Sequence, residues 1–287
     1  MNVFLNGQFV PEERAFVSVF DRGFLYGDGL FETVPIYHGK PFRWTQHLER
    51  LQRGADFLKI PLPYSCDSLR EFASQLIANN QMPLSLLRLT LSRGVGTRGY
   101  SPKGAERPSL VMSLHPAPTR QPQAVPRWRL VTSSFRLPAT ERLAQFKTCN
   151  KLPQILARAE ADAANADEAL LLNTDGYVVE ASSSNLFWIE GGAVRTPPLA
   201  SGILPGVTRS VVLEICQGLD LEVREMMVFP EGLRGAQGLF LSLSSMGIVE
   251  GLSVDGHGLT QSLLVQRLHA GYWDLVRSES QGVAPLR

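Results

Sequence analysis

The sequence has 287 residues, a formal net charge of +1, 44% hydrophobic residues and 19% charged residues. Such a chain can bury one large core or two ordinary ones, and its composition is typical of globular proteins. The small net charge argues against nucleic acid or an anionic membrane as a partner, and no apolar run approaches the roughly 20 residues of a membrane span. We therefore expect a globular protein with neither partner.

The cysteines and histidines also exclude some classes. Cys66, Cys149 and Cys216 are odd in number and form no CxxC pair, which suits a reducing compartment and argues against a disulfide framework. The five histidines show no metal-ligand spacing, so we expect no metal. The first residues, MNVFLNGQFV, lack the basic and apolar regions of a signal peptide. These features predict a cytoplasmic location.

The first elements in chain order predict an N-terminal α/β domain over residues 1–117. VFLNGQFV indicates a hairpin around Asn6-Gly7, and LFETVPIYHGKPF indicates a strand, a turn and a short return. Apolar residues at steps of three and four predict a helix over Thr45–Leu58, and a second helix is expected over Ser68–Asn79. SLLRLTLSRG and PSLVMSLHP predict two further strands.

A polar, proline-rich stretch then predicts an interdomain linker, residues 118–124, followed by a C-terminal domain, residues 125–287. In this domain WRLVTSSF predicts a strand, and residues 151–165 predict an alanine-rich helix. EALLLNTDGYVVEA and SNLFWIEGGAVRTP each predict a hairpin. TRSVVLEICQGL predicts a helix, and GLFLSLSSMGIVEGL predicts a strand that enters a loop.

Lys147 lies in FKTCNKLPQILARAE, beside Phe146 and just before the alanine-rich helix. Most lysines are exposed, so an ordinary surface charge is one interpretation. The other is that burial lowers the pKa of the lysine and makes its amine available for Schiff-base chemistry. Lys151, one helical turn further on, is a second candidate for this role.

Glu180 ends the apolar run Val178-Val179-Glu180 and is followed by three serines and an asparagine. A charge at a strand end beside a polar turn is common. Alternatively, the carboxylate pairs with a pyridinium nitrogen, which would make the ring a better electron sink, and the serines contact the same cofactor.

Residues 203–209, ILPGVTR, place a glycine before a Val-Thr pair at the start of a predicted helix. Backbone N–H groups at a helix N-terminus, together with the Thr208 hydroxyl, can bind phosphate. Alternatively, Thr208 caps the first turn of the helix. Ser244 and Ser245 follow another apolar run and add a second pair of hydroxyl groups.

A glycine-rich segment at residues 93–102, RGVGTRGYSP, follows a predicted strand and contains Arg93 and Arg98. It lacks the GK[ST] ending of a nucleotide-binding loop, and no GxGxxG opens a helix. Because arginine binds carboxylates through two parallel hydrogen bonds, the segment is a candidate clamp for a substrate carboxylate. The alternative is a flexible basic surface loop, which in a protein-binding module would contact a partner.

Together these segments resemble the class IV aminotransferase family, the fold-type IV pyridoxal-5′-phosphate (PLP) enzymes, over nearly the whole chain. Four motifs carry the resemblance in order: DRGFLYGDGLFET with HLERL, KTCNKLPQ, EASSSNLF and LPGVTR. The resemblance implies an α/β (α+β) fold with a small N-terminal α/β domain and a larger, strand-rich C-terminal domain. It also implies PLP in the interdomain cleft and a homodimer in which the partner's loop closes the site.

The resemblance further implies roles for individual residues. Lys147 would hold PLP covalently and later carry a proton, and Glu180 would pair with the pyridine nitrogen. Leu204 is expected behind the cofactor ring, and Ser184 is expected to contact the cofactor. The phosphate contacts are expected from Arg50, Val207, Thr208 and Ser244. Substrate contacts are expected from Phe31, Arg98, Tyr100 and Ser245.

The subfamily signals point in two directions. RGVGTRGYSP, GDGLFET and NKLPQ resemble the aminodeoxychorismate lyases, although Leu243 stands where these lyases usually have asparagine. LPGVTR and Arg98 resemble transaminases, although Tyr100 and Phe31 replace a histidine and a tyrosine of the D-amino-acid enzymes. We expect a lyase that releases 4-aminobenzoate and pyruvate from 4-amino-4-deoxychorismate. The alternative is a transaminase of D-amino acids or branched-chain L-amino acids.

Overall fold

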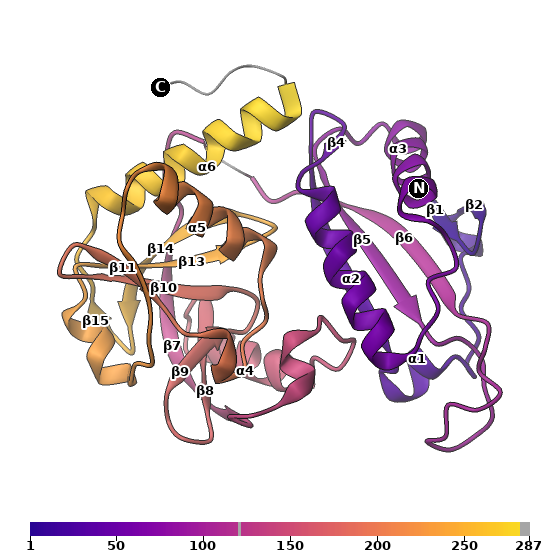
Figure 1. The fold of residues 1–287 in the computed structure, drawn as a ribbon, viewed down its shortest axis with the longest axis horizontal. Helices are drawn as coiled ribbons and strands as arrows, with labels where there is room; N and C mark the ends of the chain where they lie inside the picture. Colours follow the sequence, from indigo (N-terminus) through magenta and orange to yellow (C-terminus); the bar gives the residue numbers. More distant parts are fainter. Residues whose placement is uncertain (120–121, 282–287) are drawn as a thin grey trace. The chain divides into compact units, whose positions relative to one another are not determined.

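The computed structural model describes residues 1–119 and 122–281, which divide into two compact units (Figure 1). Unit 1 contains Met1–Pro118, Phe146–Asn150 and the end of the last helix from Ser278, whereas unit 2 contains Thr119–Gln145 and Lys151–Arg277. The predicted linker includes positions 120 and 121, which lie outside the described residues. The segment with Lys147 thus belongs to unit 1, although the sequence grouped it with the C-terminal domain.

Unit 1 is built on a six-stranded antiparallel sheet in the order β2-β1-β6-β5-β3-β4. The predicted hairpin is confirmed, since β1 and β2 pair across Asn6 and Gly7, both of which have positive φ. The strands are β1 Asn2–Leu5, β2 Gln8–Pro11, β3 Gly29–Tyr37, β4 Lys40–Pro41, β5 Ser85–Ser92 and β6 Ser109–Pro116.

Among the described residues, the helices α1 Arg22–Tyr26, α2 Trp44–Leu58 and α3 Cys66–Asn80 lie in this unit, which also contains the end of the last helix. The two long predicted helices are confirmed, whereas α1 was not predicted. The apolar sides of α2 and α3 share one buried core with alternate residues of β3 and β5, among them Val34, Leu87 and Leu89. Because strand side chains alternate between faces, Phe31 and Arg88 lie on the opposite face of the sheet.

Unit 2 is built on a nine-stranded sheet in the order β12-β11-β10-β13-β14-β7-β8-β9, with β15 paired to β14. Glu180 of β9 also pairs with Asn185 of β10, so the strands β10-β13-β14-β7-β8-β9 close into a ring. The strands are β7 Arg127–Leu137, β8 Glu168–Asn173, β9 Val178–Ala181, β10 Asn185–Glu190, β11 Ala193–Thr196, β12 Val223–Glu225, β13 Gly238–Leu243, β14 Gly247–Val254 and β15 His257–Gly258.

Alternation along β8 separates two buried clusters of unit 2. Leu170 and Leu172 pack with residues of the other ring strands, whereas Leu171 packs against the helical residues Ala157 and Ala161. The helices are α4 Leu152–Ala163, α5 Val207–Gly218 and α6 Leu263–Gln281, of which α6 was not predicted. The prediction of a loop after β13 was wrong, because most of that segment forms β14.

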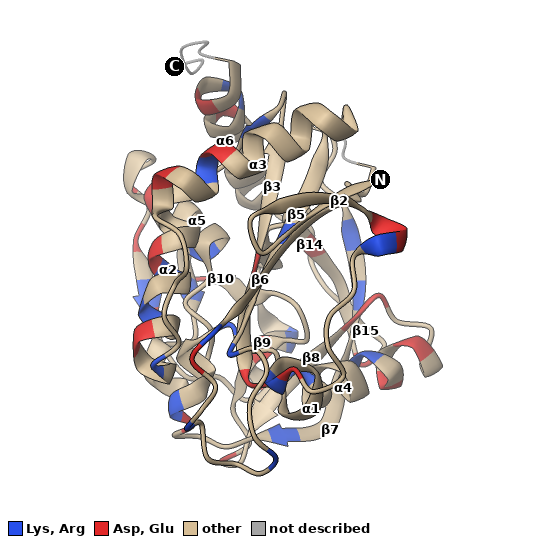
Figure 2. Cartoon of the chain, turned by 90° about the vertical axis from the view of Figure 1, so that its right-hand side faces the viewer, with Lys and Arg blue, Asp and Glu red and all other residues tan. Residues whose placement is uncertain are grey.

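No helix within residues 1–119 and 122–281 is long and apolar enough to cross a bilayer. Basic and acidic residues both occur on α2, α4 and α6 (Figure 2), which agrees with the net charge of +1.

Candidate active site

Lys147 lies beside the start of β3 in unit 1. The backbone N–H of Phe31 donates to the carbonyl of Lys147 at 2.9 Å, and the N–H of Cys149 donates to the carbonyl of Gly29 at 2.9 Å. The Nζ atom of Lys147 lies 4.7 Å from the ring centroid of Phe31. The lysine is half-buried, and its backbone is held in register with the sheet. The sequence candidates Phe31 and Lys147 are therefore in contact.

Arg50, the predicted phosphate ligand, belongs to a buried charged group on the α2 side of β3. Its Nε and Nη2 atoms donate to the carboxylate of Glu32 at 2.8 and 2.6 Å, and His47 Nδ1 lies 2.7 Å from the same carboxylate. Burial alone would raise the pKa of Glu32, but the charge and hydrogen bonds of Arg50 lower it to about 2. Arg50 is thus held by a carboxylate that stays ionised.

The pKa of His47, the histidine of this group, is shifted by its surroundings. Burial lowers the pKa of His47, the nearby carboxylate of Glu32 opposes this effect, and the positive charges of Arg50 and Lys147 add to it. Neutral imidazole is therefore the favoured form. Sequence reasoning missed both Glu32 and His47, although FET and HLERL contain them within quoted motifs.

Arg88 is a further residue that sequence reasoning missed. Its Cζ atom lies 3.9 Å from the ring centroid of Phe31, so Arg88 and Lys147 flank the same ring. Burial lowers the pKa of Arg88, with Cys149 opposing the shift. Within the described part of the chain no carboxylate pairs with this half-buried guanidinium, which suits it to an anionic ligand. The sequence signal that could have identified Arg88 is a charged residue inside the apolar strand SLLRLTLS.

The glycine-rich segment separates its two arginines. Arg98 is exposed, and Tyr100 is 88% exposed. The interpretation of Arg93 as part of a carboxylate clamp was wrong, because Arg93 is 8% exposed and pairs with Asp28 at 2.8 Å. Its other donors bind backbone carbonyls at the end of α2. Only Arg98 of this pair remains a candidate for substrate binding.

In unit 2 the strand that carries Glu180 is tied to the loop before α5. Glu180 Oε2 accepts a hydrogen bond from the backbone N–H of Leu204 at 3.0 Å. Asn185 Nδ2 donates to the carbonyl of Leu204 at 2.9 Å. Two predicted cofactor residues, Glu180 and Leu204, are therefore brought together. Asn185 was not predicted, although it ends the quoted ASSSN run.

The N-terminus of α5 has no side-chain cap. Gly206 occupies the cap position with φ −69° and ψ 136°, so the interpretation of Thr208 as the cap was wrong. Val207 and Thr208 form the buried first turn, and a Cβ atom at position 206 would lie 2.1 Å from Asn185 Oδ1. Uncapped N–H groups and a close backbone approach are features that suit a phosphate group.

The three serines after Glu180 differ in their partners. The hydroxyls of Ser182 and Ser183 donate to Glu168, a fully buried carboxylate at the start of β8. Ser184 Oγ is buried and has no hydrogen-bond partner among the described residues. A buried hydroxyl without a partner is costly, so a bound polar group would stabilise this position. Ser244 and Ser245 are half-buried and lie in the turn between β13 and β14.

These features fit PLP in its chemical requirements. A primary amine can bind the aldehyde of PLP. An arginine and an uncapped helix start can bind its phosphate, and a carboxylate can pair with its ring nitrogen. Unit 1 holds Phe31, Arg50, Arg98, Tyr100 and Lys147, and unit 2 holds Glu180, Ser184, Leu204, Val207, Thr208, Ser244 and Ser245.

Residues 29–254 match the family described as amino-transferase class IV. The chain therefore belongs to the class IV aminotransferase family, and it is a PLP-dependent enzyme with the fold-type IV architecture.

The relatives carry more than one activity. The aminodeoxychorismate lyase of Bacillus subtilis is 30% identical over 250 residues, which cover 86% of this chain and 84% of that protein. The D-alanine aminotransferase of Staphylococcus aureus is 29% identical over 296 residues, with 97% and 99% covered. The branched-chain aminotransferase of Thermoproteus uzoniensis, solved with norvaline, has a TM-score of 0.90 at 28% identity, with 98% and 96% covered.

Proposed function

We propose that the protein is a 4-amino-4-deoxychorismate lyase that produces 4-aminobenzoate and pyruvate. The observation that carries the proposal is the environment of Arg88. This half-buried cation has no carboxylate partner in the described chain, and it contacts the Phe31 ring that Lys147 also contacts. With Arg98 it makes two arginines available, and this substrate carries two carboxylates. The likeness to the lyase of Bacillus subtilis supports the same choice.

One group of site residues would hold the cofactor. Lys147 would bind it covalently, Arg50 and the first turn of α5 would bind its phosphate, and Glu180 would pair with the ring nitrogen. Ser184 and Ser244 would donate hydrogen bonds to it, and Leu204 would lie against it. When bound, PLP withdraws electrons from the carbon that carries the substrate amine.

The residues of the chain then move one proton and orient the substrate. The Lys147 amine takes the proton from the ring carbon that bears the amino group. The C–O bond to the enolpyruvyl group breaks as the substrate ring becomes aromatic, and the leaving enolate takes up a proton to give pyruvate. Arg88 and Arg98 hold the two carboxylates, Phe31 and Tyr100 contact the substrate ring, and Ser245 adds a hydrogen bond.

A transaminase is the second candidate. The likeness to the D-alanine aminotransferase of Staphylococcus aureus covers nearly both chains and favours this reaction class. The same lysine would then return the proton to the cofactor, and the substrate would be a D-amino acid or a branched-chain L-amino acid, with a 2-oxo acid as the acceptor.

The visible spectrum of the purified protein with PLP distinguishes the two candidates. D-alanine, L-leucine and L-glutamate are added in turn, and pyruvate release from 4-amino-4-deoxychorismate is measured in parallel. The lyase proposal expects pyruvate and 4-aminobenzoate in equal amounts, with a yellow protein that none of the amino acids bleaches. Bleaching by one amino acid without pyruvate release would overturn the lyase proposal and identify a transaminase.

We also propose a homodimer in the cytoplasm. Large apolar side chains on and before α1 are exposed in the single chain, with exposed fractions of 77% for Phe16, 64% for Phe20 and 75% for Phe24. A cluster of this kind is typical of a protein interface. Three free cysteines suit a reducing compartment.

A further inference from the structure

We propose that Arg22 is a positioning residue that fixes the substrate-recognition loop, defined here as residues 94–108. The inference rests on the proposed function, in which Arg98 and Tyr100 of this loop contact the substrate. All the residues that carry it belong to unit 1.

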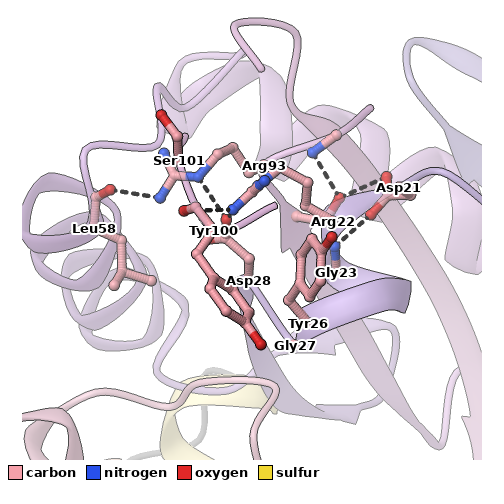
Figure 3. Close-up of polar contacts among 12 residues, drawn as sticks. Asp21, Arg22, Gly23, Tyr26, Gly27, Asp28, Leu58, Arg93, Tyr100 and Ser101 are labelled. Atoms are coloured by element: carbon pink, nitrogen blue, oxygen red, sulfur yellow. Dashed lines mark hydrogen bonds and ion pairs between the residues drawn. The ribbon is translucent and has the colours of Figure 1, made fainter. Parts of the chain in front are cut away.

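Arg22 joins α1 to the tip of the loop through hydrogen bonds from all three of its guanidinium nitrogens. Its Nε donates to Asp28 Oδ2 at 2.9 Å, its Nη1 donates to the Gly99 carbonyl at 2.8 Å, and its Nη2 donates to the Tyr100 carbonyl at 3.2 Å. The arginine is only 3% exposed. Figure 3 shows Arg22 and Arg93 both directed at Asp28. A buried charge with all these bonds fixes the backbone of residues 99 and 100.

Asp28 connects this anchor to the helix that carries Arg50. Arg93 Nε donates to Asp28 Oδ2 at 2.8 Å, and its Nη1 and Nη2 donate to the carbonyls of Lys59 and Leu58 at 3.1 and 2.8 Å. Burial alone would raise the pKa of Asp28, but the bonds from Arg93 and Arg22 lower it, so the carboxylate stays ionised. One ionised carboxylate therefore links the end of α2 to the loop.

Tyr26, at the end of α1, makes a second attachment. Its hydroxyl accepts a hydrogen bond from the backbone N–H of Gly99 at 3.1 Å, and its ring lies 5.7 Å from that of Tyr100, edge to face. The base of the loop is held as well, because the backbone N–H of Arg22 donates to the Gly94 carbonyl at 2.9 Å. Gly94 has φ +82°, and a side chain there would collide with the Arg107 carbonyl.

The attachments determine which groups the loop presents. The carbonyls of Gly99 and Tyr100 are turned toward Arg22, whereas the side chains of Arg98 and Tyr100 are exposed. The loop therefore offers a cation and an aromatic ring in a fixed arrangement before substrate arrives. Such preorganisation strengthens binding because less freedom is lost when the ligand is bound.

The test compares Arg22→Lys and Tyr26→Phe with the wild-type holoenzyme. Lysine keeps a charge beside Asp28 but lacks the planar fork that reaches both carbonyls. Phenylalanine removes only the hydroxyl group, so it guards against a failure of the first variant to fold. Arg14→Lys is the matched control, since Arg14 is an exposed arginine of the same unit.

Three readouts are taken on each protein. Trypsin cleavage after Arg98 and Lys103 is followed by mass spectrometry and reports the freedom of the loop without any substrate. KM and kcat are measured with whichever of 4-amino-4-deoxychorismate, D-alanine, L-leucine or L-glutamate the wild type converts, and PLP affinity is measured by spectral titration.

We expect cleavage and KM each to rise about tenfold in Arg22→Lys and less in Tyr26→Phe, with kcat and PLP affinity nearly unchanged. Arg14→Lys should behave as the wild type. Unchanged cleavage would overturn the anchor, and faster cleavage with unchanged KM would overturn its role in substrate binding. Failure of the proposed function is distinguishable from failure of the anchor. In the first case the wild-type protein would convert none of the substrates, and the cleavage comparison would still test the anchor.

Discussion

Lys147 and Lys151 lie close together in sequence but have different surroundings. Lys147 belongs to unit 1 and faces the ring of Phe31, whereas Lys151 precedes α4 in unit 2. Replacing Lys147 by alanine should remove the covalent attachment of PLP and lower turnover by at least 10²–10⁴-fold, roughly the contribution of a single proton-transfer group. Turnover and the visible spectrum are measured, with Lys151→Ala as the control that keeps both. Full activity in Lys147→Ala would exclude Lys147 as the cofactor lysine.

Glu32 gives a prediction about pH. Its pKa is lowered from 4.5 to about 2 in the folded protein, so the stability that it contributes is present above pH 4.5 and is lost as the pH falls toward 2. Glu32→Gln leaves Arg50 and His47 without their carboxylate and should cost about 3–5 kcal/mol at neutral pH, as for other broken buried pairs.

Urea unfolding of the wild type and Glu32→Gln at several pH values measures this effect. The difference in unfolding free energy should shrink steadily below pH 4.5. Glu49→Gln, an exposed position on α2, should leave stability within about 0.5 kcal/mol of the wild type. A difference that is the same at pH 3 and pH 7 would contradict the charged state of Glu32.

Single residues show where sequence reasoning stops. Lys147 and Glu180 could be selected because motifs surround them, but the roles of Arg88 and Arg93 depend on distant partners. Arg93 meets Asp28, 65 residues earlier, and Arg88 meets Phe31 on a neighbouring strand. Periodicity places both arginines near a strand and does not say which one has a carboxylate beside it.

At the scale of elements, the start of α5 depends on a glycine. A Cβ atom at Gly206 would lie 2.1 Å from Asn185 Oδ1, so Gly206→Ala must move Asn185 or the loop that holds Leu204. We expect a loss of stability of about 1–3 kcal/mol and weaker PLP binding. The matched control is Gly218→Ala in the last turn of the same helix, where the added carbon would meet no heavy atom within 4 Å among the described residues other than the helix's own adjacent backbone.

Thermal unfolding and PLP titration of both variants measure the effect. Gly218→Ala should be neutral or stabilising by up to about 1 kcal/mol, because alanine favours a helix more than glycine does. Equal PLP affinity in the two variants would show that the start of α5 is not a phosphate site.

Local pattern predicted most elements and missed those whose stability comes from elsewhere. Helices α2 to α5 follow from apolar periodicity, and the hairpin β1–β2 follows from its turn residues. The short helix α1 depends on Asp21 and Gly27 at its two ends. In α6, Gly271 weakens the helical pattern, yet it sits where a side chain would lie 2.9 Å from Ile215 of α5, so packing explains the glycine. The parallel pairing of β7 with β8 and β14 is also non-local.

At the scale of the whole molecule, the exposed apolar cluster predicts the oligomeric state. Phe24→Asp introduces a charge into the proposed interface and should convert the dimer to a monomer. Light scattering with size-exclusion chromatography gives the mass. Leu84→Asp, at a position 57% exposed in the same unit, is the control that should remain dimeric. A wild-type monomer would refute the proposed homodimer.

The assignment of residues 146–150 to unit 1 has a consequence for the order of folding. A chain that ends at Pro118 contains the complete six-stranded sheet but no Lys147, and a chain that begins at Thr119 contains the lysine without the strand that holds it. During synthesis β3 is therefore made long before its neighbouring segment leaves the ribosome. The Lys147 segment can reach its place beside β3 only after these later residues have been made, so neither half alone contains both the lysine and the strand beside it.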